Sequence, residues 1–347
     1  MSPREQLLRE RLSRIPAPQV APSPAVQEAL ADTERYLGSD AALRSLVQDP
    51  YWPKWHSPWW HMLLLLELGE AQRIPQRTLH AMSARLEAMP VKCFPIAPGE
   101  LPPGMDLHRD TLCHCAVASI VQVLAAGGLD VDRALPWAKP WLLRYQMADG
   151  GLTCDNDAYR VSGECPSSMV GTVSPLEAML LGDPAGWSAA QRAFVDRAAG
   201  FLVGRELRRG SATVHNAEER SREPLWLRVC FPRFYFYDVL RGARVLVRWA
   251  ELRGAPLPLE AVEAVALHLC EAFPDGVVRP QRQAYEGTGT LAPDAAGTWT
   301  RQPASRFPLL EATSAIGEPS PWLTRHWTET RQGLLRLLDA GRLRARS

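Results

Sequence analysis

The sequence has no excess of charge, no long apolar run and very little lysine. Its 347 residues carry a formal net charge of +1, so no global field attracts nucleic acid or an anionic membrane. The longest apolar run, Met62 to Leu66, is far too short to cross about 30 Å of hydrocarbon, and the N-terminus has no signal-peptide pattern. We expect a cytoplasmic protein with no nucleic-acid partner and no membrane span.

The chain also lacks the Cys-x-x-Cys spacing that makes a zinc site specific. It has seven cysteines, an odd number that excludes complete pairing, and in this context reduced thiols are expected. Reduced thiols are also available to bind a metal ion.

What the sequence does contain is helical periodicity. From Ala25 onward apolar residues recur at helical spacing, and no alternation runs long enough for a sheet. The pattern predicts an all-α domain over 25–347, preceded by a partly disordered N-terminal arm over 1–24, where prolines interrupt the helical pattern. The predicted helices are 25–37, 57–70, 76–89, 107–127, 131–147, 173–182, 188–208, 231–253, 258–273 and 320–339. The segments 153–172, 209–230 and 279–304 lack this periodicity, and we predict functional loops in the first two.

The turn Gln146 to Leu152 follows a helix rich in Trp and Leu. Gly150 and Gly151 can take the positive φ angles of a tight reversal, and Gln146 can hydrogen-bond the neighbouring backbone. This Q-x-x-D-G-G turn resembles the repeat unit of the squalene-cyclase and protein-prenyltransferase superfamily. The stretches 165–177, 215–219 and 231–241 are similar to uncharacterised bacterial proteins with the same repeat. The resemblance, which covers about 135 to 250, implies a single α/α toroid, a barrel of paired helices around a central cavity.

The reaction motifs of the better-known relatives are missing. No Asp-x-Asp-Asp run and no Asp-Asp-x-x-Asp run occurs, so a standard triterpene cyclase is not expected. The prenyltransferases bind zinc through an Asp-x-Cys turn and a later His, whereas here Cys154 precedes Asp155, so the match to that pattern is loose. Their separate helical subunit is also absent here. The resemblance implies a cyclase or transferase that acts on a lipophilic, terpenoid-like molecule, with zinc as the candidate cofactor. The alternative is a toroidal binding or scaffold protein that recognises a peptide or a partner subunit, and carbohydrate processing is a third option.

Potential metal ligands are densest between Asp106 and Cys115. On a helix that began near 107, His108 and Cys115 would share a face, whereas Cys113 and Cys115 would point about 200° apart. One helix would then supply at most two of the three or four ligands that zinc needs. The others would come from loops gathered at the mouth of the barrel, or the thiols are packing residues and the carboxylates cap turns. The candidate metal ligands are His108, Cys115, Cys154, Cys165 and His215.

Candidate catalytic residues lie in the predicted loops. His215 can act as a general base oriented by Glu218 or Glu219, and Asp155 with Asp157 can form an acid–base pair. Capping by Asn216 and turn stabilisation by the aspartates are the competing interpretations.

Aromatic residues mark the predicted helix 231–253. If its start faces the cavity, Phe234, Tyr235 and Tyr237, together with Trp59, can bind an apolar guest. Arg233 and Arg241 flank this aromatic run; they can bind an anionic group such as diphosphate, or they form a buried ion-paired network with Asp238. Plain core packing is the alternative for the aromatic residues.

Overall fold

The computed structural model describes residues 2–285 and 289–345, and the described chain is mostly helical. The prediction of a helical fold is therefore confirmed at this level, with four short strands in addition. The α-helices are α1 (Pro3–Arg14), α2 (Pro24–Leu37), α3 (Asp40–Gln48), α4 (Pro58–Leu68), α5 (Gln76–Glu87), α6 (His114–Ala126), α7 (Val131–Ala134), α8 (Ala138–Arg144), α9 (Met169–Met179), α10 (Ala189–Gly204), α11 (Glu223–Trp226), α12 (Val239–Arg253), α13 (Leu259–Ala272), α14 (Pro308–Thr313) and α15 (Pro321–Asp339). The strands are β1 (Leu257–Pro258), β2 (Gly289–Pro293), β3 (Trp299–Pro303) and β4 (Leu343–Arg344). Strands β1 and β4 pair in parallel, and β2 and β3 form an antiparallel hairpin.

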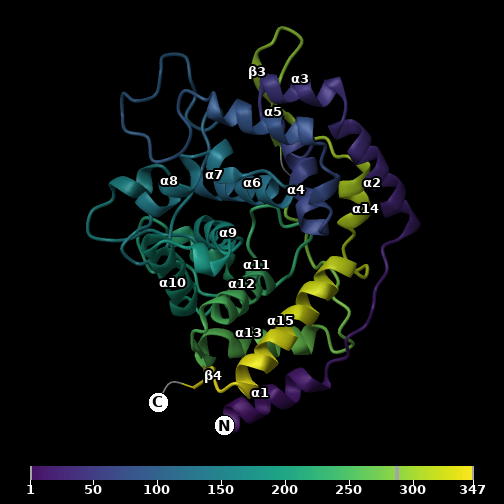
Figure 1. The fold of residues 1–347 in the computed structure, drawn as a ribbon, viewed down its shortest axis with the longest axis vertical. Coiled ribbons are helices and arrows are strands. Elements are labelled where there is room, and N and C mark those ends of the chain that lie inside the picture. Colours follow the sequence, from purple (N-terminus) through teal and green to yellow (C-terminus); the bar gives the residue numbers. More distant parts are fainter. Residues whose placement is uncertain (1, 286–288, 346–347) are drawn as a thin grey trace.

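The helices follow one another around the molecule in chain order (Figure 1). Helix α4 packs on α6, α6 on α9, α9 on α12 and α12 on α15. The N-terminal helix α1 packs on α13 and α15, so the first helix lies beside the last ones. These contacts place five helices, α4, α6, α9, α12 and α15, around one shared space.

Composition explains why α4 and α6 lie inside. Nearly every residue of PWWHMLLLLEL in α4 and of HCAVASIVQVLAA in α6 is buried. A helix that is apolar on all sides must be covered on all sides. The described residues include no helix that is both long and apolar enough to cross a membrane.

Part of the predicted N-terminal arm is a packed helix. Ser2 and Glu5 form a capping box at the start of α1, which satisfies two helix-end N–H groups. Leu8 and Leu12 are fully buried, and the Glu5 carboxylate accepts the N–H of Ala345 at 2.9 Å. The predicted domain boundary at residue 24 stays a prediction.

Two predicted helices begin later than expected. The helix predicted from 107 begins at His114, because the Asp106 carboxylate accepts the N–H groups of His108 and Arg109 and forms a turn there. The helix predicted from 231 begins at Val239, with Asp238 as its N-cap, so the aromatic run that precedes it is not helical. The periodicity also missed α3, α14 and the hairpin β2–β3; residues 286–288 of the segment 279–304 lie outside the described residues.

The two-glycine turn is present, but the positive φ predicted for both glycines is found at Gly150 and not at Gly151. Gly150 has φ +89°, and a Cβ there would lie 2.3 Å from the carbonyl oxygen of Arg197. Gly151 does not have a positive φ, but a Cβ there would lie 2.5 Å from Cβ of Ser167. The Gln146 amide donates to the carbonyls of Gly150 at 2.7 Å and Phe194 at 2.9 Å. The turn thereby fixes the chain that leads to Cys154.

Candidate metal centre and adjoining cavity

Three cysteine side chains meet at the N-terminus of α6. The sulfur atoms of Cys113, Cys115 and Cys154 all lie within 4.8 Å of one another, and Sγ of Cys113 is 3.1 Å from Sγ of Cys115. None of the three forms a disulfide. They form the group of potential metal ligands that we call the thiol cluster.

The backbone at the start of α6 explains how Cys113 and Cys115 converge. The expectation that they point about 200° apart is wrong, because it assumed that both are helical. Cys113 is the N-cap residue, with extended angles φ −99° and ψ 169°, whereas Cys115 lies in the first turn. Because Cys113 is extended, its side chain turns back toward the helix, and its sulfur lies close to that of Cys115.

Cys154 reaches the cluster because its segment is tied to α6. Nδ1 of His114 lies 2.9 Å from the carbonyl oxygen of Thr153 and 3.1 Å from the hydroxyl of Tyr159. His114 is fully buried, and burial lowers its pKa to about 4, so the ring is neutral at pH 7. His114 therefore acts as a tie between two chain segments, not as a member of the thiol cluster.

The three thiols do not titrate alike. Hydrogen bonds from the thiols of Cys115 and Cys154 hold the pKa of Cys113 well below its ordinary value, and the N–H of Ala116 adds to this. Thiolates are also favoured at helix N-termini. The hydrogen bond with Cys113, together with burial, raises the pKa of Cys115, although the hydrogen bond with Cys154 opposes this. Hydrogen bonds with Cys113 and Cys115, together with burial, raise the pKa of Cys154. Of the three thiols, Cys113 is therefore the one that the cluster favours as a thiolate.

A lysine lies against the thiol cluster. Burial lowers the pKa of Lys54, and negative charge on Cys113 and Cys115 raises it. Its Nζ donates to the hydroxyl of Tyr235 at 3.1 Å and lies 5.2 Å from the centre of the Trp52 ring. The ammonium group is thus held among aromatic rings and interacts electrostatically with Cys113 and Cys115, so it can balance negative charge there.

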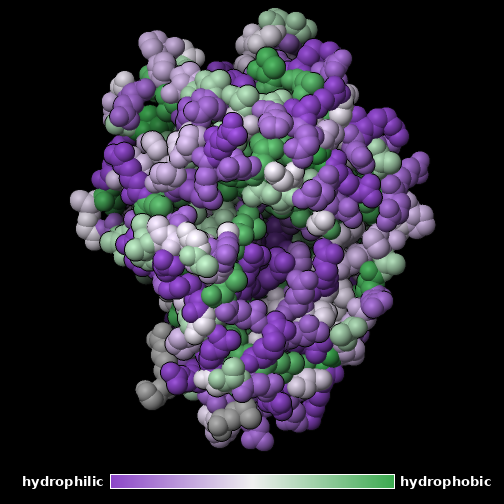
Figure 2. Space-filling view, in the orientation of Figure 1, coloured by the Kyte–Doolittle hydropathy of each residue, from purple (hydrophilic) through white to green (hydrophobic). Residues whose placement is uncertain are grey.

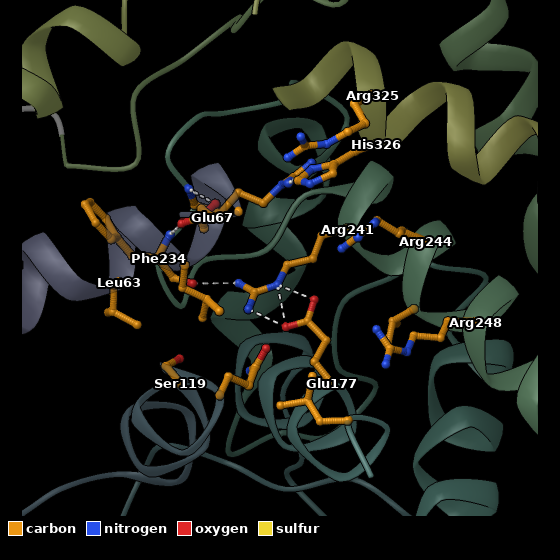
Figure 3. A pocket seen from close by; sticks show the side chains of 16 residues that line it. Leu63, Glu67, Ser119, Glu177, Phe234, Arg241, Arg244, Arg248, Arg325 and His326 are labelled. Atoms are coloured by element: carbon orange, nitrogen blue, oxygen red, sulfur yellow. Dashed lines mark hydrogen bonds and ion pairs between the residues drawn. The ribbon is translucent and has the colours of Figure 1, made fainter. Parts of the chain in front are cut away.

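A cavity of about 240 Å³ lies among α4, α6, α9, α12 and α15 (Figure 3). Its lining is strongly cationic and is apolar on one side. The arginines of the lining are Arg233, Arg241, Arg244, Arg248 and Arg325, and its carboxylates are Glu67 and Glu177. We call this space the arginine cavity.

Two of these arginines are buried and paired. Nε of Arg233 lies 2.7 Å from Asp238, and Nη2 of Arg241 lies 2.6 Å from Glu177. Arg241 also donates to Ser174 and to the carbonyl of Phe234 at 3.1 Å. Arg241 therefore ties α12 to α9 and to the loop before α12.

Helix α6 joins the two places. Cys115, Ser119 and Gln122 are four and three residues apart, so they share one face of α6. Ser119 and Gln122 line the arginine cavity. The thiol cluster consequently lies about one helical turn, roughly 5.4 Å along the axis, from the cavity wall.

The structure brings together two of the five residues predicted as metal ligands, Cys115 and Cys154, and adds Cys113. Among the described residues, His108, Cys165 and His215 are not members of this group. His108 is exposed, and His215 instead pairs with Asp155, with Nε2 and Oδ2 2.7 Å apart.

The predicted acid–base residues lie apart from the cavity lining. The His215 and Asp155 pair is partly exposed, and its hydrogen bond helps to hold the pKa of Asp155 below its usual value despite partial burial. Asp157 is exposed and pairs with Arg160 at 2.8 Å, and Glu218 is exposed. None of the four lines the arginine cavity.

The predicted aromatic residues separate into three environments. Phe234 lines the arginine cavity, and Tyr235 contacts Lys54. The Tyr237 hydroxyl donates to the carbonyl of Leu207 at 2.6 Å, which makes it a core residue, and Trp59 is fully buried against Tyr51. Of the predicted set, Arg233, Arg241 and Phe234 reach the cavity.

Sequence reasoning missed the role of Lys54 and the rim arginines Arg244, Arg248 and Arg325. Lys54 carries a usable signal, because it is one of only three lysines in the chain and follows an aromatic run. The rim arginines carry no such signal among so many arginines.

Comparisons of the chain with family models, curated proteins and solved structures found no match.

Proposed function

We propose that this protein is a zinc-dependent enzyme of the α/α toroid type, in which Cys113, Cys115 and Cys154 hold the ion. The observation that carries the proposal is the convergence of three sulfurs within 4.8 Å. The toroid interpretation is supported by the successive contacts from α4 to α15 around one cavity. A cyclase or transferase reaction on a small molecule with an apolar part is the expectation that the sequence resemblance adds.

The thiol cluster fits zinc in distance and in chemistry. Two sulfurs bound to one tetrahedral zinc at 2.3 Å lie roughly 3.8 Å apart. The sulfur separations, 3.1 Å for the closest pair and at most 4.8 Å, bracket that value. Thiolates are soft ligands that favour zinc over magnesium or calcium.

The charge balance fits as well. Three thiolates and one Zn²⁺ sum to a net charge of about −1. Burial lowers the pKa of Lys54, and the charge of the thiolates at Cys113 and Cys115 opposes this lowering, so the ammonium form can neutralise negative charge at the cluster.

Within the described residues the group has three members, and three protein ligands leave one position of a tetrahedral zinc for water or substrate. Zinc bound there would supply Lewis acidity, or activation of a bound oxygen or sulfur nucleophile. Lys54 and Tyr235 can hold a proton beside that position, since their side chains are hydrogen-bonded at 3.1 Å. The aromatic rings around Lys54 limit access of water.

The test is the metal content of the protein purified without added metal. We expect about one zinc per chain, reduced at least tenfold in Cys113→Ser and Cys154→Ser. Cys165→Ser is the matched control and should keep its zinc, because Cys165 is not part of the thiol cluster. Zinc retained in both cluster variants, or no zinc in wild type after growth in zinc-replete medium, would overturn the proposal.

A second measurement separates a catalytic site from a structural one. Cobalt exchanged into the site gives a visible spectrum that depends on all four ligands. Addition of a small thiol should change that spectrum if the fourth position is exchangeable. An unchanged spectrum would favour a structural metal in a binding or scaffold protein.

A further inference from the structure

We propose that the arginine cavity binds the phosphate group of a small molecule whose apolar part lies against Leu63, Leu66 and Val245. The binding of such a ligand is inferred from the cavity alone, whereas its assignment as the substrate rests on the proposed function.

The first support is uncompensated positive charge. Among the described residues, Arg248 and Arg325 have no carboxylate partner; they donate to the carbonyl oxygens of Leu180 at 2.9 Å and Leu68 at 3.3 Å. The pair of Arg244 with Glu329 is 3.4 Å long, and both side chains are about half exposed, at 43% and 50%. Such an exposed pair binds weakly, so Arg244 is free to turn to a ligand.

Counting charges gives the same result. Five arginines of the lining face Glu67 and Glu177, and even with Asp238 and Glu329 the cations outnumber the carboxylates. His326 also lines the cavity, and burial together with Arg244, Arg233 and Arg325 holds its pKa well below the ordinary value. An anion would find several guanidinium groups and a neutral imidazole.

The second support is independent and concerns buried hydrogen-bonding atoms. Nη2 of Arg233 and Oγ of Ser119 are buried and have no hydrogen-bond partner within the described part of the chain. Both residues line the cavity, and they are 4% and 2% exposed. Buried donors without acceptors are costly and rare. An oxyanion in the cavity supplies acceptors for both.

The possible ligand-binding side chains lie on several sides of the cavity. In Figure 3 Arg325 lies on one side of the cavity, Arg244 and Arg248 lie on another, and Ser119 lies across from them. The protein face in Figure 2 is hollowed near its centre, with hydrophilic residues around the hollow, where α12 and α15 approach each other in Figure 1. A ligand can therefore enter past the exposed rim arginines Arg248 and Arg325.

Phosphate suits this lining better than carboxylate. A phosphate monoester carries nearly two negative charges and three acceptor oxygens, and guanidinium groups bind it in bidentate fashion. A carboxylate carries one charge and has two oxygens, which is too little for two arginines without a carboxylate partner, the weakly paired Arg244 and two unpartnered donors.

The test is calorimetric titration of the full-length protein with inorganic phosphate, phenyl phosphate and benzoate. We expect phenyl phosphate to bind most tightly, because its ring reaches the apolar side of the cavity. Inorganic phosphate should bind more weakly, and benzoate least. Benzoate that binds as tightly as phenyl phosphate would overturn the phosphate assignment, and inorganic phosphate that binds most tightly would overturn the apolar part.

Variants locate the binding. Arg248→Gln and Arg325→Gln should each weaken phenyl phosphate at least tenfold. Arg336→Gln is the matched control: Arg336 lies on α15 like Arg325, but it is exposed and pairs with Glu251 at 2.7 Å. Equal affinity in the two cavity variants and wild type would overturn the proposal.

Ser119→Ala distinguishes ligand binding from a structural role. Removal of a buried hydroxyl without a partner should leave the unfolding midpoint unchanged or higher, whereas phenyl phosphate affinity should fall severalfold. A lower midpoint with unchanged affinity would refute a role of Ser119 in binding. The double variant Cys113→Ser/Cys154→Ser should bind phenyl phosphate as wild type does, so failure of the zinc site and failure of the phosphate site are measured separately.

Discussion

The thiol cluster and the arginine cavity lie about one turn of α6 apart, yet they are built in opposite ways. The cluster comes from two short segments around Cys113 and Cys154, whose backbone places three soft ligands together. The cavity takes its lining from five helices between Leu63 and His326. One site depends on local turn geometry, and the other exists only after the helices pack.

The thiol cluster and the arginine cavity also differ in the cationic groups that they contain. The cluster has a half-buried ammonium group beside it, that of Lys54, whose compact charge fits between aromatic rings. The cavity has several guanidinium groups. Arg233 and Arg241 are buried and paired, and we call them the floor arginines; Arg248 and Arg325 are exposed at its rim. The difference predicts that floor arginines determine stability and rim arginines determine binding.

The largest effect is expected at Arg241 and tests the difference between the floor and the rim arginines. Arg241→Met removes a buried guanidinium that binds Glu177, Ser174 and the carbonyl of Phe234. We expect a loss of about 3–5 kcal/mol in the free energy of unfolding, because Glu177 loses its partner. Arg248→Gln should change it by less than about 0.5 kcal/mol. Urea denaturation measures both, and equal losses would break the distinction between floor and rim.

The next effect concerns pH. In the metal-free protein the pKa of Cys113 is lower than in the unfolded chain, so the folded state binds fewer protons and is stabilised as pH rises. This contribution is fully present above the unfolded pKa and is lost as pH falls, by up to about 1.4 kcal/mol per pH unit. We expect the stability difference between metal-free wild type and Cys113→Ser to shrink from pH 9 toward pH 6. A difference that is independent of pH would show that Cys113 is not a thiolate.

A smaller effect is expected at Lys54. Lys54→Met should weaken zinc binding about tenfold, since the negative charge of the thiolates loses its counterion. Lys139→Met is the control, because Lys139 pairs with Asp132 at 2.8 Å and is not a neighbour of the thiols. Competition with a chromophoric chelator measures both affinities. If Lys139→Met weakens zinc as much as Lys54→Met does, the effect is one of net charge alone.

The smallest effect is expected at His215. His215→Ala removes a partly exposed pair with Asp155, which should change the free energy of unfolding by less than about 1 kcal/mol. Zinc content should not change. Loss of zinc in this variant would show that His215 is a ligand after all and would extend the thiol cluster to a second loop.

The sequence predicted the presence of helices better than their first residues. Periodicity found most of the long helices, but it extended α6 and α12 toward their N-termini. In both places an aspartate side chain binds backbone N–H groups and makes a turn or an N-cap. Periodicity does not register such hydrogen bonds, so the polar residues before α6 and the aromatic residues before α12 were assigned to helices.

The same error decided which metal ligands could be predicted. Cys115 and Cys154 were among the candidates, whereas Cys113 was set apart from Cys115 because a helical angle was assumed for both. The N-cap conformation of Cys113 reverses that conclusion. His108 and His215 were included on the expectation that loops converge at one mouth, which spacing alone cannot establish.

Most of the lining of the arginine cavity could not be predicted from the sequence. Arg244, Arg248 and Arg325 are three of many arginines, and their convergence depends on how α12 and α15 pack on each other. Arg233, Arg241 and Phe234 were singled out, because they belong to the aromatic run or flank it. Helix packing over long sequence separations is the part of this fold that local patterns do not encode.

We propose that three sulfurs bind one zinc ion, and X-ray absorption at the zinc edge of the purified protein measures the ligands of that ion. We expect three sulfur neighbours at about 2.3 Å and one lighter neighbour at about 2.0 Å. A shell of nitrogen and oxygen without sulfur would contradict it.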